Sequence, residues 1–306
     1  MSPPLAPTTS PTHAMVVDVL AHGDPATVSV HWPSAGSPAE PIEPATMAQL
    51  RRQLDALHEA ERDRQNTAVP TTRQALGRTL WHLLDGPSRR LARAMATAQA
   101  QDEPLDLIVR LRSTTDAVRL AHHPATTWRW ELLSPEGGCH PTADGRLRLA
   151  VQLGDAEPAQ APRVLEYGGL RIVFMAYSPR GVEPLLDYEA EEDRILQALE
   201  RPIREHRAQV EVVEYGTLAE LEERLRGAPA DVVHLTGHGR LTPEGPRLVM
   251  EDELGQPDFV SPEQLLRALR RAAKKPDLVV ISSCHSAEGR DGMPSLAATL
   301  VDGGIP

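Results

Sequence analysis

The sequence predicts an α/β fold in which a mainly parallel sheet is flanked by helices, and two observations carry this prediction. First, Val232 to Leu235 and Leu278 to Ile281 are short apolar runs bounded by Pro, Gly or Ser. Such runs are typical of strands that are buried on both faces of a parallel sheet. Second, strand-like and helix-like segments alternate up to Cys284, which indicates strand-helix-strand units with helices on the faces of the sheet.

The first half of the chain is expected to hold a mixture of helices and strands. Leu50, Leu54 and Leu57 recur at helical spacing among many charged residues. The Pro/Thr/Ser-rich residues 1–14 are expected to form a disordered tail, and Asp155 to Pro162 is the best candidate for a linker. The expected elements are a hairpin over 16–20 and 27–32, a loop over 33–46, helices over 47–66, 72–84 and 88–98, and strands over 105–111 and 147–153.

Helix-start signals organise the second half of the chain. Thr217 with Glu220 and Ser261 with Gln264 have the spacing of a capping box, and Pro262 occupies the first position of the later helix. The expected elements are strands over 170–177 and 210–215, helices over 187–199 and from 217 and 261, a hairpin over 247–251, and the two apolar strands named above.

Composition excludes several classes of function. A net charge of −11 argues against general nucleic-acid binding, which needs basic residues to neutralise phosphates. The chain has only two cysteines, no apolar stretch of membrane-spanning length and no signal-type N-terminus, so we expect a cytoplasmic protein without membrane association. His234 and His238 could suggest a metal pair, but no further Cys or His completes such a site, and neither metal nor cofactor is expected.

Two reactive side chains follow the two apolar runs. The first run breaks at Gly237 just before His238, and the second ends at Ser282-Ser283 just before Cys284. The carboxyl ends of neighbouring parallel strands are where α/β sheets bind ligands. The thiol and the imidazole are therefore expected to meet there, with the imidazole activating the thiol. The backbone N–H groups of Gly239 and Cys284 are candidate donors to an oxyanion.

Two other reactive positions have weaker patterns. Cys139-His140 repeats the Cys-His pair but lies in the loop-like segment PEGGCHPTADG, and we interpret Cys139 as an ordinary loop thiol. His285 follows Cys284 directly. Because successive side chains in extended backbone point apart, a structural or rim role is favoured for His285.

The segments HLTGHG and SSCHSA, with their flanking strands, resemble the catalytic His and Cys blocks of the CHAT peptidases, a branch of the caspase and separase clan. The His comes first, 46 residues before the Cys, close to the spacing of about 50 in caspase-like chains. LRIVFMAYSP with LDYEAEEDRILQALE is similar to the first strand and helix of the family's catalytic half. WRWELL is similar to an aromatic-acidic segment of the preceding half, with Arg129 where proline is usual. The resemblance covers Leu105 to Pro306.

The resemblance implies a caspase-like catalytic half preceded by a degenerate caspase-like α/β half. Residues 15–158 are expected to form the non-catalytic half and residues 159–306 the catalytic half, truncated at its C-terminus because the family continues into further strands. A regulated cysteine endopeptidase acting on a protein substrate is implied, with Cys284 as nucleophile and His238 as general base. The implied setting is bacterial antiviral defence or programmed cell death. A sensor or activator module is the implied partner, in the missing C-terminal part or elsewhere.

The residue Ser282 bears on the choice of substrate. Relatives that cut after Arg or Lys carry a carboxylate two residues before the nucleophile, where this chain has Ser282, so a strongly basic preference is not expected. Two alternatives to the endopeptidase remain open. One is an interaction module that binds a peptide without cutting it, and the other is a Cys-His amidohydrolase that acts on a small substrate.

Overall fold

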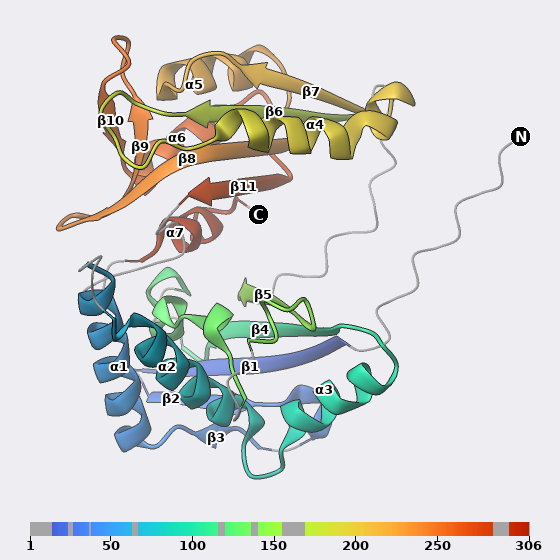
Figure 1. The fold of residues 1–306 in the computed structure, drawn as a ribbon, viewed down its shortest axis with the longest axis vertical. Helices are drawn as coiled ribbons and strands as arrows, with labels where there is room; N and C mark the ends of the chain where they lie inside the picture. Colours follow the sequence, from blue (N-terminus) through green and yellow to red (C-terminus); the bar gives the residue numbers. More distant parts are fainter. Residues whose placement is uncertain are drawn as a thin grey trace, which may run out of the picture. The chain divides into compact units, whose positions relative to one another are not determined.

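The computed structural model describes residues 14–23, 27–36, 38–62, 67–115, 120–135, 140–154, 169–283 and 294–305. These residues form two sheets and seven α-helices, so the fold is mixed α/β (Figure 1). The chain divides into two compact units, which we call the N-terminal unit (residues 1–118 and 123–156) and the C-terminal unit (119–122 and 157–306). The expected linker lies outside the described residues, as does the expected tail except for Ala14, which begins the first strand.

The N-terminal unit is a five-stranded sheet with three helices. Its elements are β1 (Ala14–His22), β2 (Thr27–His31), β3 (Glu40–Pro41), α1 (Pro44–Arg62), α2 (Val69–Asp85), α3 (Arg90–Ala100), β4 (Leu105–Ser113) and β5 (Leu147–Leu153). The strand order is β3-β2-β1-β4-β5, in which β1, β4 and β5 pair in parallel and β1, β2 and β3 pair antiparallel. The predicted hairpin, three helices and two strands are confirmed. The predicted loop over 33–46 is wrong in part, because β3 and the start of α1 fall within it.

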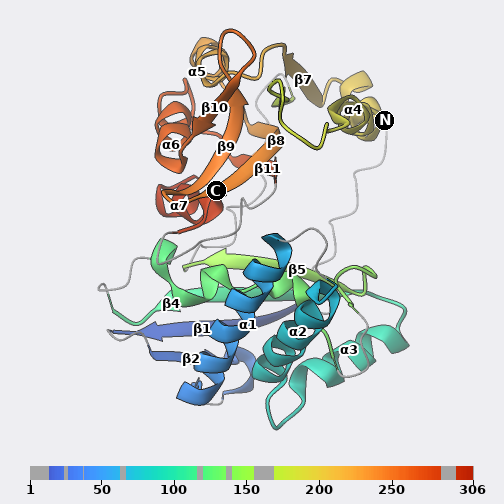
Figure 2. The ribbon, with the colours of Figure 1, turned by 60° about the vertical axis from the view of Figure 1, so that its left-hand side comes forward.

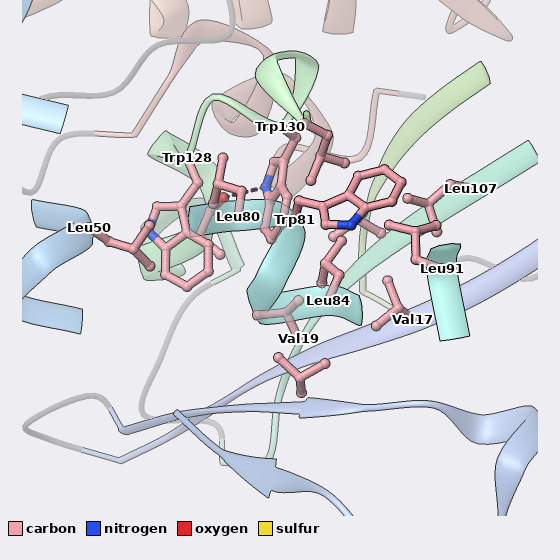
Figure 3. Packing of buried hydrophobic residues seen from close by; sticks show 14 of the residues in the cluster. Val17, Val19, Leu50, Leu80, Trp81, Leu84, Leu91, Leu107, Trp128 and Trp130 are labelled. Carbon is pink, nitrogen blue, oxygen red and sulfur yellow. Dashed lines mark hydrogen bonds between the residues drawn. The ribbon is translucent and has the colours of Figure 1, made fainter. Parts of the chain in front are cut away.

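The helices α1, α2 and α3 lie on the same face of this sheet (Figures 1 and 2). Alternate residues of β1 and β4 point toward them and join one apolar core with helix leucines. Trp81, Trp128 and Trp130 pack in the middle of that core (Figure 3). The indole nitrogen of Trp130 is satisfied there, because it donates to the carbonyl of Ala125 at 2.9 Å. The segment WRWELL therefore serves the packing of the N-terminal unit.

The C-terminal unit is a six-stranded sheet covered on both faces. Its elements are β6 (Leu170–Tyr177), α4 (Tyr188–Arg204), β7 (Ala208–Val213), α5 (Leu218–Gly227), β8 (Val232–Thr242), β9 (Gly245–Glu251), β10 (Pro257–Val260), α6 (Pro262–Arg270), β11 (Leu278–Ser283) and α7 (Leu296–Asp302). Strands β7, β6, β8 and β11 are neighbours that pair in parallel, and β8, β9 and β10 pair antiparallel. Helix α4 lies on one face, and α5, α6 and α7 lie on the other (Figure 2).

The helix starts of this unit follow the capping signals in the sequence. Ser261 Oγ accepts from the backbone N–H of Gln264 at 3.2 Å, and Gln264 Oε1 accepts from the N–H of Ser261 at 2.8 Å, which completes the predicted capping box of α6. At the start of α5 the predicted capping box is only half formed: Thr217 Oγ1 accepts from the N–H of Glu220 at 3.1 Å, but the Glu220 carboxylate accepts from Arg224 Nε at 2.8 Å. These caps fix the helices that return the chain to the sheet between β7 and β11.

The prediction that β8 ends at Gly237 is wrong. The strand continues through His238 to Thr242 and forms a hairpin with β9. The apolar run marks only the part of β8 that is buried between β6 and β11, whereas the following residues pair with β9 and need not be apolar. The segment 247–251, predicted as a hairpin, is the single strand β9 within that larger hairpin.

Candidate active site

Strand β8 changes partners at one point, and the candidate histidine lies there. Gly237 is the last residue of β8 that pairs in parallel, with Tyr177 of β6 on one side and Ser283 of β11 on the other. His238 is the first residue that pairs antiparallel, with Val249 of β9. His238 therefore lies directly beyond the carboxyl ends of β6 and β11, at the edge where α/β sheets bind ligands.

The aromatic ring of Tyr177 explains why a glycine precedes His238. A Cβ atom on Gly237 would lie 2.3 Å from two ring carbons of Tyr177, and a Cβ atom on Gly216 would lie 2.6 Å from Tyr177 Cβ. Tyr177 is 1% exposed and belongs to the core of the C-terminal unit, so close packing restricts the movement of its ring. Both glycines are therefore required for close packing beside the histidine, rather than for a strand end.

The side chain of His238 is buried, and one of its ring nitrogens has no partner among the described residues. The residue is 8% exposed, and its Nε2 has no hydrogen-bond partner within the described part of the chain. Burial lowers the pKa of His238 below its usual value, the positive charge of Arg240 lowers it further, and the negative charge of Glu183 opposes both. A neutral imidazole with an available nitrogen can accept a proton at neutral pH.

A second polar group lies on the same face of β8, before His238 in the chain. Thr236 Oγ1 donates to Glu191 Oε2 at 2.6 Å. His234 Nε2 lies 3.3 Å from Glu191 Oε1, within ion-pair distance but without hydrogen-bond geometry, and the ring of Phe174 meets His234 edge-on at 5.3 Å between centroids. Glu191 belongs to the first turn of α4. These contacts therefore fasten the start of α4 to the sheet next to the candidate site.

The described site residues from the sequence prediction lie at one end of the sheet. Gly239 follows His238 and pairs with Leu248 of β9. Ser282 is exposed on β11 and pairs with Thr236. Cys284, His285 and Cys139 lie outside the residues that the structure describes, and Ser283 is the last described residue before Cys284.

Sequence reasoning missed three charged residues of this region, namely Glu183, Glu191 and Arg240. A signal for Arg240 exists, because the residue two positions after His238 lies on the same face once β8 is extended past Gly237. Glu191 gives no such signal. Its contact with Thr236 depends on how α4 docks on the sheet, which local sequence patterns do not specify.

Two properties of the described residues bear on the wider class of the protein. Among them, no three His, Cys, Asp or Glu side chains are grouped so that they could hold a metal ion. No helix within these ranges is both long enough and apolar enough to cross a membrane.

Comparison with protein families supports what the segments around His238 and Cys284 suggest. No match was found among curated proteins. Residues 47–306 match the family model of the CHAT domain, a family associated with caspase-like cysteine peptidases. The match begins in α1 and thus extends further toward the N-terminus than the resemblance from Leu105 onward. Because this match spans most of both units, the chain belongs to the CHAT-domain family.

Proposed function

We propose that this protein is a cysteine endopeptidase that uses Cys284 as nucleophile and His238 as general base and then general acid. The observation that carries the proposal is the buried imidazole of His238, whose Nε2 has no partner among the described residues. A buried nitrogen without a hydrogen bond costs stability, by about 1–3 kcal/mol. Such a cost is typical of a functional group that is reserved for a reaction.

Covalent geometry supports the choice of Cys284. Ser283 pairs with Gly237, and neighbouring strands lie about 4.8 Å apart. Cys284 is bonded to Ser283, so its Cα lies within about 3.8 Å of the Ser283 Cα. Cys284 and His238 each follow a residue of this pair in the chain, and this register supports the choice of Cys284 as the thiol that His238 activates.

The reaction follows from these groups. His238 Nε2 takes the proton of the Cys284 thiol, and the sulfur attacks the scissile carbonyl carbon of the substrate. The N–H groups of Gly239 and Cys284 donate to the oxyanion of the tetrahedral intermediate. His238 then returns the proton to the leaving amine as the C–N bond breaks, and water hydrolyses the thioester. The balance of atoms requires neither a metal nor a cofactor.

Membership of the CHAT-domain family supports a proposal for the wider role. We propose that residues 159–306 form a caspase-like catalytic half and residues 15–158 a degenerate counterpart, and that the protein cuts a protein substrate in the bacterial cytoplasm. The response is antiviral defence or programmed cell death, under the control of a sensor or activator module. Because an uncontrolled protease is toxic, peptide cleavage by the complete protein is expected to rise when its activator is added. Equal rates with and without the activator would contradict this control.

Labelling with a peptidyl electrophile tests the proposal. The complete protein is incubated with a peptidyl acyloxymethyl ketone, and the modified residue is identified by mass spectrometry. Labelling of Cys284 that disappears in His238→Ala and persists in Cys139→Ala is the expected result. Peptide binding without labelling would instead favour an interaction module. Labelling at Cys284 with no new protein N-termini in treated cell extract would favour an amidohydrolase of small substrates.

A further inference from the structure

Arg240 lies on the same face of β8 as the candidate histidine. The two residues are two positions apart in one strand, so their side chains point the same way and their Cα atoms are roughly 6.6 Å apart. The guanidinium is close enough to contribute to the lowered pKa of His238. The positive charge of Arg240 therefore acts on the candidate site.

The guanidinium of Arg240 is oriented by an aromatic ring and not by a carboxylate. Its Cζ lies 5.6 Å from the centroid of the Phe259 ring on β10, a cation–π distance. Arg240 is exposed, and no ion pair between described residues includes it. Four other arginines of the C-terminal unit, by contrast, pair with glutamates, namely Arg171, Arg201, Arg207 and Arg224. Arg240 is therefore a positioned cation whose charge faces solvent.

A second arginine stands directly opposite the first. Arg247 of β9 is the cross-strand partner of Arg240, and its Nη1 donates to the carbonyl of Pro246 at 3.2 Å. Like charges directly opposite each other in an antiparallel pair are destabilising. Two acidic residues act on this region electrostatically: Glu183 acts on His238, and the exposed Glu244 interacts with Arg247. An anion bound between the two arginines would relieve their repulsion.

We propose that Arg240 and Arg247 form an anion-binding subsite of the candidate active site, which takes an Asp or Glu side chain of the substrate protein close to the scissile bond. This inference rests on the proposed function and names its substrate class. Ser282 agrees with it, because this exposed residue at the same end of the sheet offers a hydroxyl and not a carboxylate. The chain has a net charge of −11, yet Arg240 and Arg247 lie opposite each other on β8 and β9. This local positive charge favours an acidic ligand over a basic one.

A matched peptide panel tests the subsite. Fluorogenic peptides carry Asp, Asn or Lys at one of three positions on either side of the scissile bond, and kcat/KM is measured with the complete, activated protein. We expect at least a tenfold preference for Asp over Asn at one position, as for a charge-assisted hydrogen bond. Arg240→Glu should abolish or reverse this preference, and Arg240→Lys should keep part of it. Arg267→Glu on α6 makes the same charge change on the opposite face and should leave the preference intact.

A binding measurement separates failure of the subsite from failure of the enzyme. Kd values for the Asp and Asn peptides are measured by titration of Cys284→Ala, alone and combined with Arg240→Glu. Tighter binding of the Asp peptide that Arg240→Glu removes would support the subsite even if no peptide is cut. Cleavage without any preference for Asp, or equal Kd values for both peptides, would overturn the subsite and leave the proposed protease intact.

Discussion

The two units of the molecule share a backbone arrangement in which a histidine directly follows the last parallel pair between two strands. In the N-terminal unit, Ala21 of β1 pairs with Ser113 of β4, and His22 is the next residue. His22 Nδ1 lies 3.0 Å from Thr114 Oγ1, and its Nε2 lies 2.7 Å from Ser29 Oγ. Both ring nitrogens of His22 are therefore occupied by hydroxyl groups.

The C-terminal unit has the same arrangement with different side chains. Gly237 pairs with Ser283. His238 follows Gly237 in the chain, and Cys284 follows Ser283. In the N-terminal unit, His22 and Thr114 occupy the positions that correspond to His238 and Cys284, and their side chains are in contact. Yet His238 is buried with Nε2 unpartnered among the described residues. Both units therefore place a histidine directly after the last parallel pair, but the ring of His22 is bonded at both nitrogens, whereas Nε2 of His238 has no hydrogen-bond partner in the described part of the chain.

The largest expected effect is on cleavage and separates the two histidines. Cys284→Ala should abolish cleavage because it removes the nucleophile, and His238→Ala should abolish it or lower kcat/KM by at least 10²-fold, because general acid–base catalysis contributes about 10²–10⁴-fold. His22→Ala should leave kcat/KM within about twofold and lower the melting temperature, because it removes two hydrogen bonds. Cys139→Ala is the thiol control. Inactivation by His22→Ala or Cys139→Ala would refute the assignment.

A buried histidine of the N-terminal unit should affect stability and not catalysis. Burial lowers the pKa of His123 to about 4, while the backbone of Val19 and Arg112 opposes the shift. The unfolded chain therefore binds more protons than the folded one between about pH 4 and 6.5, so stability is lost as pH falls through this window. The loss from this group is about 3 kcal/mol.

The variant His123→Asn isolates that contribution. Asparagine can still accept the N–H of Ala125, which His123 Nδ1 accepts at 3.1 Å, but it does not titrate. Urea unfolding of the wild type and the variant at pH 7 and pH 4 measures the difference. A pH dependence that is the same in both proteins would contradict the origin assigned to it.

The glycine before His238 should be sensitive to a single added methyl group. Gly237→Ala would bring a Cβ to 2.3 Å from the Tyr177 ring, and such overpacking costs about 1–3 kcal/mol. Activity should fall with stability, because the backbone that carries His238 must shift. Gly227→Ala is the matched control, since no atom lies within 4 Å of its added Cβ. An equal free energy of unfolding in urea for the two variants would contradict this prediction and would mean that Tyr177 moves aside at little cost.

The smallest expected effect is on the pH profile of kcat/KM. Because the pKa of His238 is lowered, its neutral, basic form persists at pH values below the usual pKa of histidine. The decrease of kcat/KM on the acidic side of the profile should therefore occur below that usual pKa. Arg240→Gln removes a charge that lowers this pKa, so the limb should move to higher pH. Glu183→Gln removes a charge that raises it, so the limb should move to lower pH. Each shift should stay below about one pH unit, and shifts in the same direction would contradict the electrostatic account.

Local patterns in the sequence predicted much of the fold but only part of the site. Strands β5 and β6 have the predicted bounds, because a short apolar segment between Gly and polar residues has one stable arrangement in a layered fold. The extension of β8 was missed because pairing with β9 needs no apolar side chains. The sequence could not distinguish Nε2 of His238, which has no partner in the ranges that the structure describes, from the bonded nitrogens of His22, because that difference depends on which hydroxyl groups the tertiary fold brings near.

Alkylation of the two cysteines of the chain tests the central claim most directly. Iodoacetamide is reacted with the complete, activated protein at pH 6.5, and the rates at Cys284 and Cys139 are measured by mass spectrometry of the peptides. Alkylation requires the thiolate, so Cys284 should react at least tenfold faster than Cys139. His238→Ala should reduce the rate at Cys284 to that of Cys139, and His22→Ala should leave both rates unchanged. A rate at Cys284 that equals that of Cys139 and does not respond to His238→Ala would contradict the account.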